Sequence, residues 1–455
     1  MDSKNGSIHK DDVEKILPYH QMSLLGLQHV LAMYSSAVAI PLIIGGGIGL
    51  TQEQIALLIA ADLFTCGIAT ILQCFGVSSL LGLKLPVLLG CSFTVIAPLI
   101  SIGNAYGLGA IYGSIIVAGI FIFLFAPVFG KMLRLFPPVV TGSIVAVIGF
   151  SLIPIAINYA AGGYEAKDWG TSIHYLMAGF VIMVILIANR YFKGFFQAIS
   201  VLIGLVSGTV IAAALGMINF SSVSNASWVS MIKPFALDTP KFFLYPCIMM
   251  IIVCLVNMVE STGVFFAIGE ICDRDIKESD IVKGLRAEGV STLLGGILNS
   301  YPYTTYSENV GLVSLTGVKS RFVVGVAGIF LLLLGVLPKF AALALTIPTD
   351  VLGGAMIVMF AMVGAAGIRM LQKADLHQNN GNLLTVTLTI GVGMGVGIVP
   401  GLFDKSPELI KVLFGSNGIV CATVVGVLVN LLFNYKDIFN LKNKLVEEDV
   451  GQIAE

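Results

Sequence analysis

Long apolar stretches separated by short polar connections run along almost the whole chain. Seven such stretches precede a polar interval at residues 219–241, and seven follow it. Stretches of this length are typical of transmembrane helices, and the second begins at Thr51–Gln54 with a sequence that fits a helix capping box. The pattern predicts an all-α polytopic membrane protein with fourteen transmembrane segments. They lie at about residues 23–46, 52–75, 86–101, 108–128, 138–158, 172–189, 198–216, 242–268, 283–298, 302–317, 321–341, 351–370, 382–400 and 415–434.

Composition excludes a soluble protein. The chain of 455 residues is 57% hydrophobic and 11% charged, whereas soluble domains carry about 25% charged residues. The net charge of −1 and the lack of a basic cluster give no indication of nucleic-acid binding. The seven cysteines are odd in number, form no CxxC pair and fall mostly in apolar runs, which indicates packing. We therefore expect no metal, no cofactor and no nucleic-acid partner.

Basic residues are distributed unevenly between alternate loops. If the N-terminus lies inside, most of the 25 lysines and arginines face the cytoplasm. This is the bias of natural membrane proteins, and it predicts a cytoplasmic N-terminal segment at residues 1–22 and a cytoplasmic C-terminal tail at residues 435–455. The basic residues left outside are Lys167, Lys233, Lys241, Lys339, Lys405 and Lys411.

The third segment of each half is short and begins at a proline step. These two segments are Leu85–Leu99, LPVLLGCSFTVIAPL, and Tyr301–Leu315, YPYTTYSENVGLVSL. Because each half has an odd number of segments, the halves must be oppositely oriented. Matched, interrupted segments in inverted halves are typical of transporter binding sites at the membrane midplane. We therefore predict a first repeat at residues 23–218, an extracellular connector at 219–241 and a second, inverted repeat at 242–434.

Ionisable side chains inside membrane segments are costly and usually functional. The chain has five of them: His29, Asp62, Glu260, Glu288 and Glu308. Glu260 has no obvious cationic partner on its segment, and removal from water favours the protonated form of a carboxyl group. A proton-coupled carrier needs such a group. For Asp62, a carboxyl group satisfied by neighbouring helices is as good an interpretation as a functional one.

Polar residues near Glu308 and His29 add to these candidates. Ser307 is predicted as the N-cap of a helix that has Glu308 and Asn309 in its first turn, and such a helix N-terminus offers unpaired N–H groups to a ligand. The Gln28-His29 pair can order a site, although a buried neutral histidine bonded to a carbonyl group explains it equally well. Three tyrosines are expected to pack around a planar ring: Tyr301, Tyr303 and Tyr306.

The run from Glu308 to Gly317, ENVGLVSLTG, contains a known signature. It matches, at every fixed position, the pattern Gln, Glu or Pro, then Asn, any residue, Gly, four of any kind, Thr, and Arg, Lys or Gly. The chain thereby resembles the nucleobase–ascorbate transporters, also called nucleobase–cation symporters of the second kind. Gln28-His29 and Glu260-Ser261-Thr262-Gly263 are also similar to motifs of that family, and the resemblance extends from the first to the fourteenth segment.

This resemblance implies a fold and a site. It implies a core of segments 1–4 and 8–11 that rocks against a gate of segments 5–7 and 12–14, homodimers formed through the gate, and short strands in segments 3 and 10 that meet at the substrate. Glu260 and Glu308 would hydrogen-bond the heterocycle, with Phe93 against its face. The implied substrate-binding residues are Glu260, Glu308, Phe93, Ser92, Asn309 and Tyr306. The implied proton-coupling and supporting residues are Glu260, His29, Glu288 and Gln28.

The chain departs from the purine carriers of the family at three positions. Purine carriers often have Gln where this chain has Glu308, which is familiar in uracil carriers. Many also have Asp where this chain has Val264, and relatives have Asp-Gly at Glu288-Gly289. Nevertheless, the stretches ALLIAADLFTCGIATILQ and MVGAAGIRML are more similar to bacterial xanthine and urate permeases. Purine and pyrimidine substrates therefore both stay open at this point.

Hydrogen-bond chemistry favours a dioxo-base in either case. A carboxylate accepts from ring N–H groups and backbone N–H groups donate to ring carbonyls, which suits xanthine, urate and uracil but not adenine. We expect a proton-coupled symporter in the cell membrane that imports a purine base such as xanthine, urate or guanine. The alternatives are a uracil–proton symporter and, third, an anion exchanger, although segments 3 and 10 lack internal Lys and Arg. An enzyme is not expected, since no HExxH or GxSxG motif is present.

Overall fold

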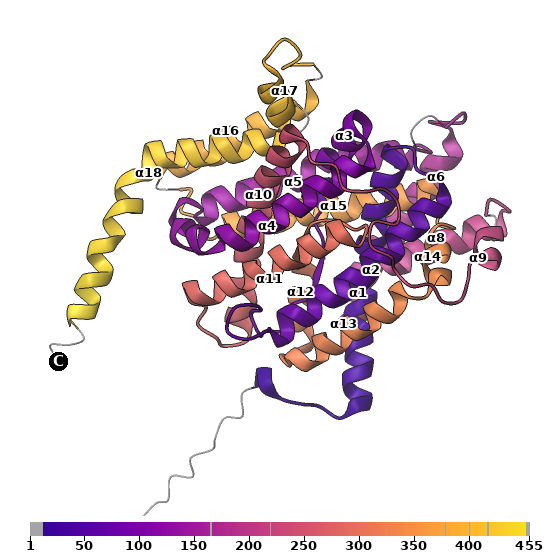
Figure 1. Cartoon of the computed structure of the whole chain (residues 1–455), viewed down its shortest axis with the longest axis horizontal. Helices are drawn as coiled ribbons and strands as arrows, with labels where there is room; N and C mark the ends of the chain where they lie inside the picture. The colour runs from indigo at the N-terminus through magenta and orange to yellow at the C-terminus, as the bar shows by residue number, and fades with distance from the viewer. Residues whose placement is uncertain are drawn as a thin grey trace, which may run out of the picture. The chain divides into compact units, whose positions relative to one another are not determined.

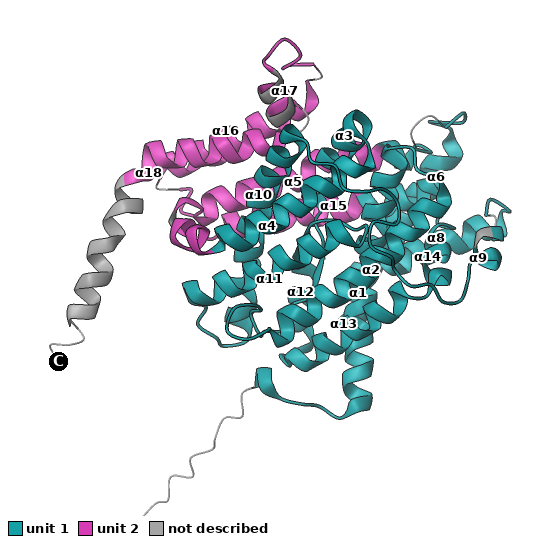
Figure 2. Cartoon of the chain, viewed as in Figure 1, with its two compact units in different colours: residues 1–126, 158–356 teal, residues 127–157, 357–455 magenta. Residues whose placement is uncertain are grey.

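The computed structural model describes residues 12–163, 166–218, 220–377, 379–399, 401–415 and 418–451, and in these residues the chain is mostly helical (Figure 1). The predicted boundary at Asn219 lies outside the described residues, as do residues 1–11 of the predicted segment 1–22 and residues 452–455 of the predicted tail. Two compact units are distinguished (Figure 2). Unit 1 comprises Met1–Ala126 and Asn158–Met356, and unit 2 comprises Pro127–Ile157 and Ile357–Glu455. The predicted repeat boundaries stay a prediction.

The elements follow one another as a long series of helices interrupted by two short strands. In order they are η1 (Asp12–Glu14), α1 (Tyr19–Gly47), α2 (Gln52–Phe75), β1 (Leu89–Cys91), η2 (Phe93–Val95), α3 (Ile96–Tyr106), α4 (Leu108–Met132), η3 (Leu133–Leu135), α5 (Pro138–Ala160), α6 (Ser172–Tyr191), α7 (Phe195–Ala198), α8 (Ser200–Ala214), α9 (Ser221–Asn225), α10 (Leu244–Ile271), α11 (Glu278–Ile297), β2 (Tyr303–Thr305), α12 (Ser307–Thr316), α13 (Arg321–Gly335), α14 (Pro338–Ala344), α15 (Thr349–Leu371), α16 (Asn380–Ile398), α17 (Glu408–Gly415) and α18 (Gly418–Gly451).

Nine helices in the described part of the chain are long and apolar enough to cross a membrane, and a tenth span results if α13 and α14 count as one. The protein is therefore a multi-pass membrane protein, as predicted. The other predicted segments coincide with the strand–helix pairs β1–α3 and β2–α12, with the shorter α8 and with the more polar α11. The count of fourteen segments stays a prediction.

One predicted segment, residues 321–341, is not a straight helix. It is broken between Gly335 and Pro338, where α13 and α14 differ in direction by 86°. Pro338 occupies the first turn of α14, the position in which its missing N–H costs no helical hydrogen bond. The proline therefore starts a new helix instead of continuing α13.

Unit 1 has its apolar core around α2. This helix packs against α13 and α1 and contacts β1. It begins with the predicted capping box, in which the Thr51 hydroxyl accepts from the Gln54 N–H and the Gln54 side chain accepts from the Thr51 N–H. Buried side chains of this core extend from the helices to the strands and include Val30, Ile59, Leu63, Leu89, Tyr303 and Leu331. The short strands are thus held inside a layer of packed helices.

Unit 2 is held together by packing of α16 against α18. Asparagine amides join these helices at one end. The Asn434 amide nitrogen donates to Asn382 at 2.8 Å and to Asn430 at 2.9 Å, and Asn379 donates to Asn434 at 3.2 Å. Amide groups often bond across helices in membrane proteins. The predicted candidate residues all belong to unit 1.

Candidate functional site

The two strands pair with each other at the centre of the candidate site. β1 and β2 are antiparallel, with Leu89 opposite Thr305, Gly90 opposite Thr304 and Cys91 opposite Tyr303. The ladder continues at both ends, because the Ser92 N–H donates to Pro302 at 3.1 Å and the Tyr306 N–H donates to Leu88 at 3.1 Å. The prediction that short strands in segments 3 and 10 meet is confirmed.

Tyr306 binds β1 from the end of β2. Its ring covers Gly90 so closely that a Cβ atom at Gly90 would clash with the Tyr306 ring atoms. Its hydroxyl donates to the Cys91 carbonyl at 2.9 Å, and the side chain is 3% exposed. Tyr306 therefore lies against β1, and its hydroxyl is used in the hydrogen bond to that strand. Glycine at position 90 is required by this close approach of a ring to the backbone.

Each strand is followed at once by the start of a helix. After β1 come η2 and α3, and after β2 comes α12 with Glu308 in its first turn. The N-cap of α12 is Tyr306, so the prediction of Ser307 as the N-cap is wrong by one residue. The reason is the Tyr306–Leu88 hydrogen bond, which keeps Tyr306 in an extended conformation. Unpaired N–H groups at such helix starts are suited to bind polar ligand atoms.

Three carboxyl groups gather beside β2. Glu288, on α11, is 1% exposed and accepts from the Thr305 hydroxyl at 2.7 Å. Glu260, on α10, is half-buried and lies within electrostatic range of both Glu288 and Glu308. In the described part of the chain none of the three forms an ion pair. The structure therefore brings the predicted carboxyl groups together, each without an ion-pair partner among the described residues.

Polar atoms without partners mark the neighbourhood of α12. The Asn309 amide nitrogen donates to Pro86 at 2.8 Å, but among the described residues its oxygen has no partner. His29 lies beside Asn309, is 4% exposed, and its Nδ1 atom also lacks a partner in the described chain. Buried polar atoms of this kind require an explanation, and here the two side chains lie next to each other. Gln28 is half-buried, and no hydrogen bond within the described residues joins it to these groups.

The turn that carries Phe93 is fixed by a polar network that the sequence analysis missed. Ser92, the N-cap of η2, accepts from the Thr94 N–H at 3.2 Å and donates to the Asn257 oxygen at 3.0 Å. The Thr94 hydroxyl also donates to Asn257, whose amide nitrogen has no partner in the described residues. Asn257 precedes Glu260 by three residues and so shares its helix face. That spacing is the signal that could have identified it.

Helix α10 contacts β2 from another direction. The Ser261 hydroxyl lies 2.9 Å from that of Thr304 and accepts from the Thr305 N–H at 3.3 Å. Ser261 is the residue after Glu260, so the family-like motif Glu260-Ser261 contributes one side chain to the strand and one to the group of carboxyls. The predicted residues Glu260, Glu288, Glu308, Asn309 and His29 are thereby arranged around one strand pair, and Ser92 and Phe93 follow β1.

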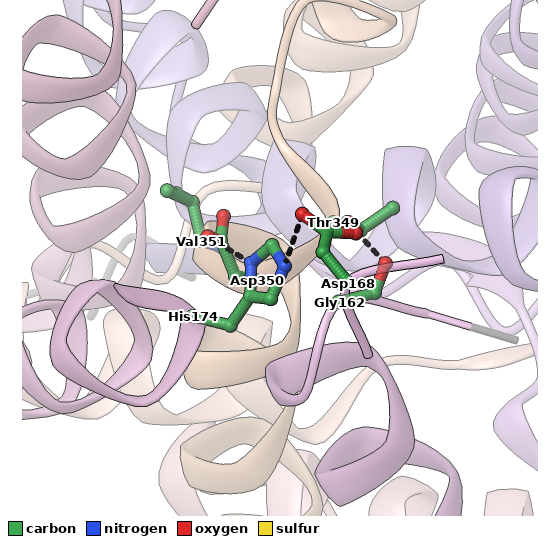
Figure 3. Close-up of polar contacts among 6 residues, drawn as sticks. All are labelled: Gly162, Asp168, His174, Thr349, Asp350 and Val351. Carbon is green, nitrogen blue, oxygen red and sulfur yellow. Dashed lines mark hydrogen bonds and ion pairs between the residues drawn. The ribbon is translucent and has the colours of Figure 1, made fainter. Parts of the chain in front are cut away.

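A second polar cluster lies on other elements (Figure 3). The His174 Nδ1 atom is 2.9 Å from Asp350 and its Nε2 atom is 3.0 Å from Asp168. The Thr349 hydroxyl donates to Gly162 at 2.9 Å. These contacts attach the loop after α5 to the starts of α6 and α15. No local pattern in the sequence predicts this cluster, because His174 and Asp350 are separated by 176 residues.

The chain is similar to known membrane transporters over most of its length. The model of the Permease family matches residues 20–402. A nucleobase transporter, PlUacP, of Paenibacillus larvae is 48% identical and covers 90% of this chain and 94% of its own. The xanthine permease of Bacillus subtilis is 46% identical, with 93% and 95% covered, and the uric acid permease PucJ of that organism is 47% identical, with 91% and 92% covered. The uracil permease of Bacillus subtilis is 30% identical, with 89% and 91% covered.

Solved structures show the same fold at low identity. The transmembrane domain of the cyanobacterial bicarbonate transporter BicA has a TM-score of 0.59 at 15% identity and covers 91% of this chain and 98% of that domain. The murine anion transporter Slc26a9, in its inward-facing state, has a TM-score of 0.62 at 13% identity, with 92% and 69% covered. At these identities the likeness concerns the fold alone.

Proposed function

This chain belongs to the Permease family of membrane transporters, which are not enzymes, and from this premise we propose that it is a proton-coupled importer of an oxopurine base. Xanthine is the first substrate we propose, with urate and guanine next. The observation that carries the proposal is the identity of 46–48% to transporters named for xanthine, uric acid or nucleobases. The uracil permease shares only 30%.

The chemistry of the site agrees with an oxopurine. Glu260 and Glu308 are acceptors for ring N–H groups, and the N–H groups at the start of α12 together with the Asn257 amide are donors for ring carbonyls. Phe93 provides a ring face for stacking. Adenine lacks the carbonyl groups, so its binding would leave donors unpaired at a cost of about 1–3 kcal/mol each.

Proton coupling is the part of the proposal that rests on the carboxyl groups. Three of them share one environment without an ion-pair partner in the described chain, and like charges so placed are unfavourable unless one is neutralised. Glu260 is the proposed proton carrier, because it is the carboxyl within electrostatic range of both others. Glu288, His29 and Gln28 are proposed to support it. No cofactor other than the proton is proposed.

The proposal also includes the architecture that the family resemblance implies. It comprises fourteen segments in two inverted repeats, alternating access by a core of segments 1–4 and 8–11 against a gate of segments 5–7 and 12–14, and a homodimer in the cell membrane with both termini cytoplasmic. Inverted repeats with broken segments at the midplane are a common transporter design. Accessibility of a cysteine introduced at the end of α18 to a membrane-impermeant reagent tests the topology.

Competition in whole cells tests the substrate. Uptake of labelled xanthine is measured in cells that lack their own purine and uracil carriers, with urate, guanine, hypoxanthine, adenine or uracil as competitors. We expect competition by urate and guanine, none by adenine, and loss of accumulation when an ionophore dissipates the proton gradient. Uptake of uracil without uptake of xanthine would replace the proposal by the pyrimidine alternative. Uptake of bicarbonate without either base would favour anion exchange.

A further inference from the structure

Asp62 lies on α2 and, like Glu288, binds a side chain of β2. Its side chain is completely buried. The Oδ1 atom is 2.8 Å from the Ser300 hydroxyl oxygen and 2.8 Å from the Tyr303 hydroxyl oxygen. These two hydroxyl oxygens are themselves only 2.6 Å apart. Three oxygen atoms therefore form a closed triangle in which every side has the length of a hydrogen bond.

The number of protons in this triangle decides its charge. A serine and a tyrosine supply one hydroxyl proton each, whereas an ionised carboxylate supplies none. With two protons, one side of the triangle would bring two oxygen lone pairs to hydrogen-bond distance with no proton between them. A third proton on the Asp62 carboxyl completes the ring, so that each oxygen donates once and accepts once. The geometry therefore favours the neutral acid.

The described residues around Asp62 include no cation that would compensate a carboxylate charge. On its own helix the Cys66 sulfur lies 3.8 Å from Oδ2, and the Cys91 thiol approaches from β1. The other titratable groups near it are phenols, those of Tyr301, Tyr303 and Tyr306. Thiols and phenols are neutral at pH 7 when they have their ordinary affinities for protons. Within the described residues no ion pair involves Asp62.

We propose that Asp62 is a proton-binding site of this transporter, occupied by a proton in the conformation seen here. Tyr303 and Thr305 lie two residues apart on β2 and so point to the same face of the strand. Tyr303 binds Asp62 and Thr305 binds Glu288. β2 is therefore fastened to two buried acids. Loss of the Asp62 proton breaks one hydrogen bond of the ring and weakens the attachment of β2 next to Glu288. That this affects proton coupling rests on the proposed function.

Infrared spectroscopy of the purified transporter in lipid tests this proposal without substrate. A protonated carboxyl group has a carbonyl-stretch band distinct from those of carboxylates, and that band shifts in D₂O. We expect Asp62→Asn to lose one such band at neutral pH, while Asp168→Asn, which changes an exposed aspartate, loses none. An unchanged band pattern in folded Asp62→Asn would show that Asp62 is ionised and would overturn the proposal.

Two further variants keep the test decisive if Asp62→Asn does not fold. Tyr303→Phe and Ser300→Ala each remove one hydroxyl from the ring and so change the hydrogen bonding of the protonated Asp62 oxygen, and the same band should shift in frequency. No shift in either variant would also overturn the proposal. Glu260→Gln should leave the Asp62 band in place, so the result does not depend on the substrate or on the proton role of Glu260.

Discussion

The Thr305 hydroxyl donates a hydrogen bond of 2.7 Å to Glu288. It connects β2, at the centre of the candidate site, to an acid that is 1% exposed. Within the described residues Glu288 forms no ion pair. The strand and the acid therefore depend on each other: the hydroxyl satisfies a buried oxygen, and the acid holds β2 in register with β1. A substitution that removes this one hydroxyl should affect both.

Thr305→Val keeps the shape of the side chain and removes the hydroxyl. We expect a loss of about 1–3 kcal/mol in stability, because Glu288 is left with an unsatisfied buried oxygen, together with reduced xanthine uptake. Thr305→Ser, which retains the hydroxyl, is the matched control and should behave nearly as the wild type. Thermal unfolding in detergent and uptake in cells measure the two effects. Equal unfolding temperatures for the Val and Ser variants would contradict the expectation.

Glu260→Gln should separate binding from coupling. Glutamine retains a hydrogen-bond acceptor for the substrate but cannot carry a proton. We expect xanthine to bind with modestly reduced affinity and to exchange across the membrane, whereas accumulation driven by a proton gradient is abolished. Calorimetry measures binding, and uptake at several external pH values measures coupling. Wild-type dependence of uptake on pH in this variant would refute the role of Glu260.

Glu308 can be tested by two substitutions of different severity. Glu308→Gln keeps an acceptor at the start of α12 and should preserve part of the purine transport. Glu308→Ala removes it, and loss of a hydrogen bond to a charged group costs about 1.5–3 kcal/mol, which corresponds to roughly tenfold or more in Kd. Binding of labelled xanthine to the purified variants measures this difference. Unchanged affinity in the alanine variant would sink the assignment.

Much of the site could be predicted because its chemistry is local in sequence. Two short segments starting with Leu-Pro and Tyr-Pro predicted the place of the site, the family resemblance implied the strand pair, and buried charge identified Glu260, Glu288 and Glu308. Other features depend on distant partners. Tyr306 was expected against a substrate ring, but its hydroxyl is committed to Cys91, and its bond to Leu88 shifts the start of α12 by one residue. Such pairings follow from tertiary structure, which overrides local capping preferences.

Asn257 is a residue of the site that spacing along its helix indicates. It precedes Glu260 by three residues on the same helix, and only the structure reveals that it also holds the turn of Ser92 and Thr94. The cluster of Asp168, His174 and Asp350 offered no comparable local signal. Its members are brought together from two helices and a loop that are far apart in the sequence.

Asn257→Asp is designed to remove a donor and leave the turn intact. Aspartate keeps the oxygen that accepts from Ser92 and Thr94, but it replaces the unpartnered amide nitrogen by an acceptor. We expect a folded protein that binds oxopurines about 1–3 kcal/mol more weakly, since a donor to a ring carbonyl is lost. Asn257→Leu, which loses both functions, should in addition lower the unfolding temperature. Wild-type affinity of the Asp variant would show that the amide nitrogen does not contact the substrate.

The two carboxylates at His174 should differ strongly in their effect on stability. Both are acceptors, so the imidazole bonds both only when each of its nitrogens carries a proton. Asp350 has a side chain 1% exposed and Asp168 one 63% exposed. Breaking a buried pair costs about 3–5 kcal/mol, whereas exposed pairs contribute about 0–1 kcal/mol. Thermal unfolding should therefore show a large loss for Asp350→Asn and almost none for Asp168→Asn. Equal losses would mean that solvent reaches both sides of the imidazole.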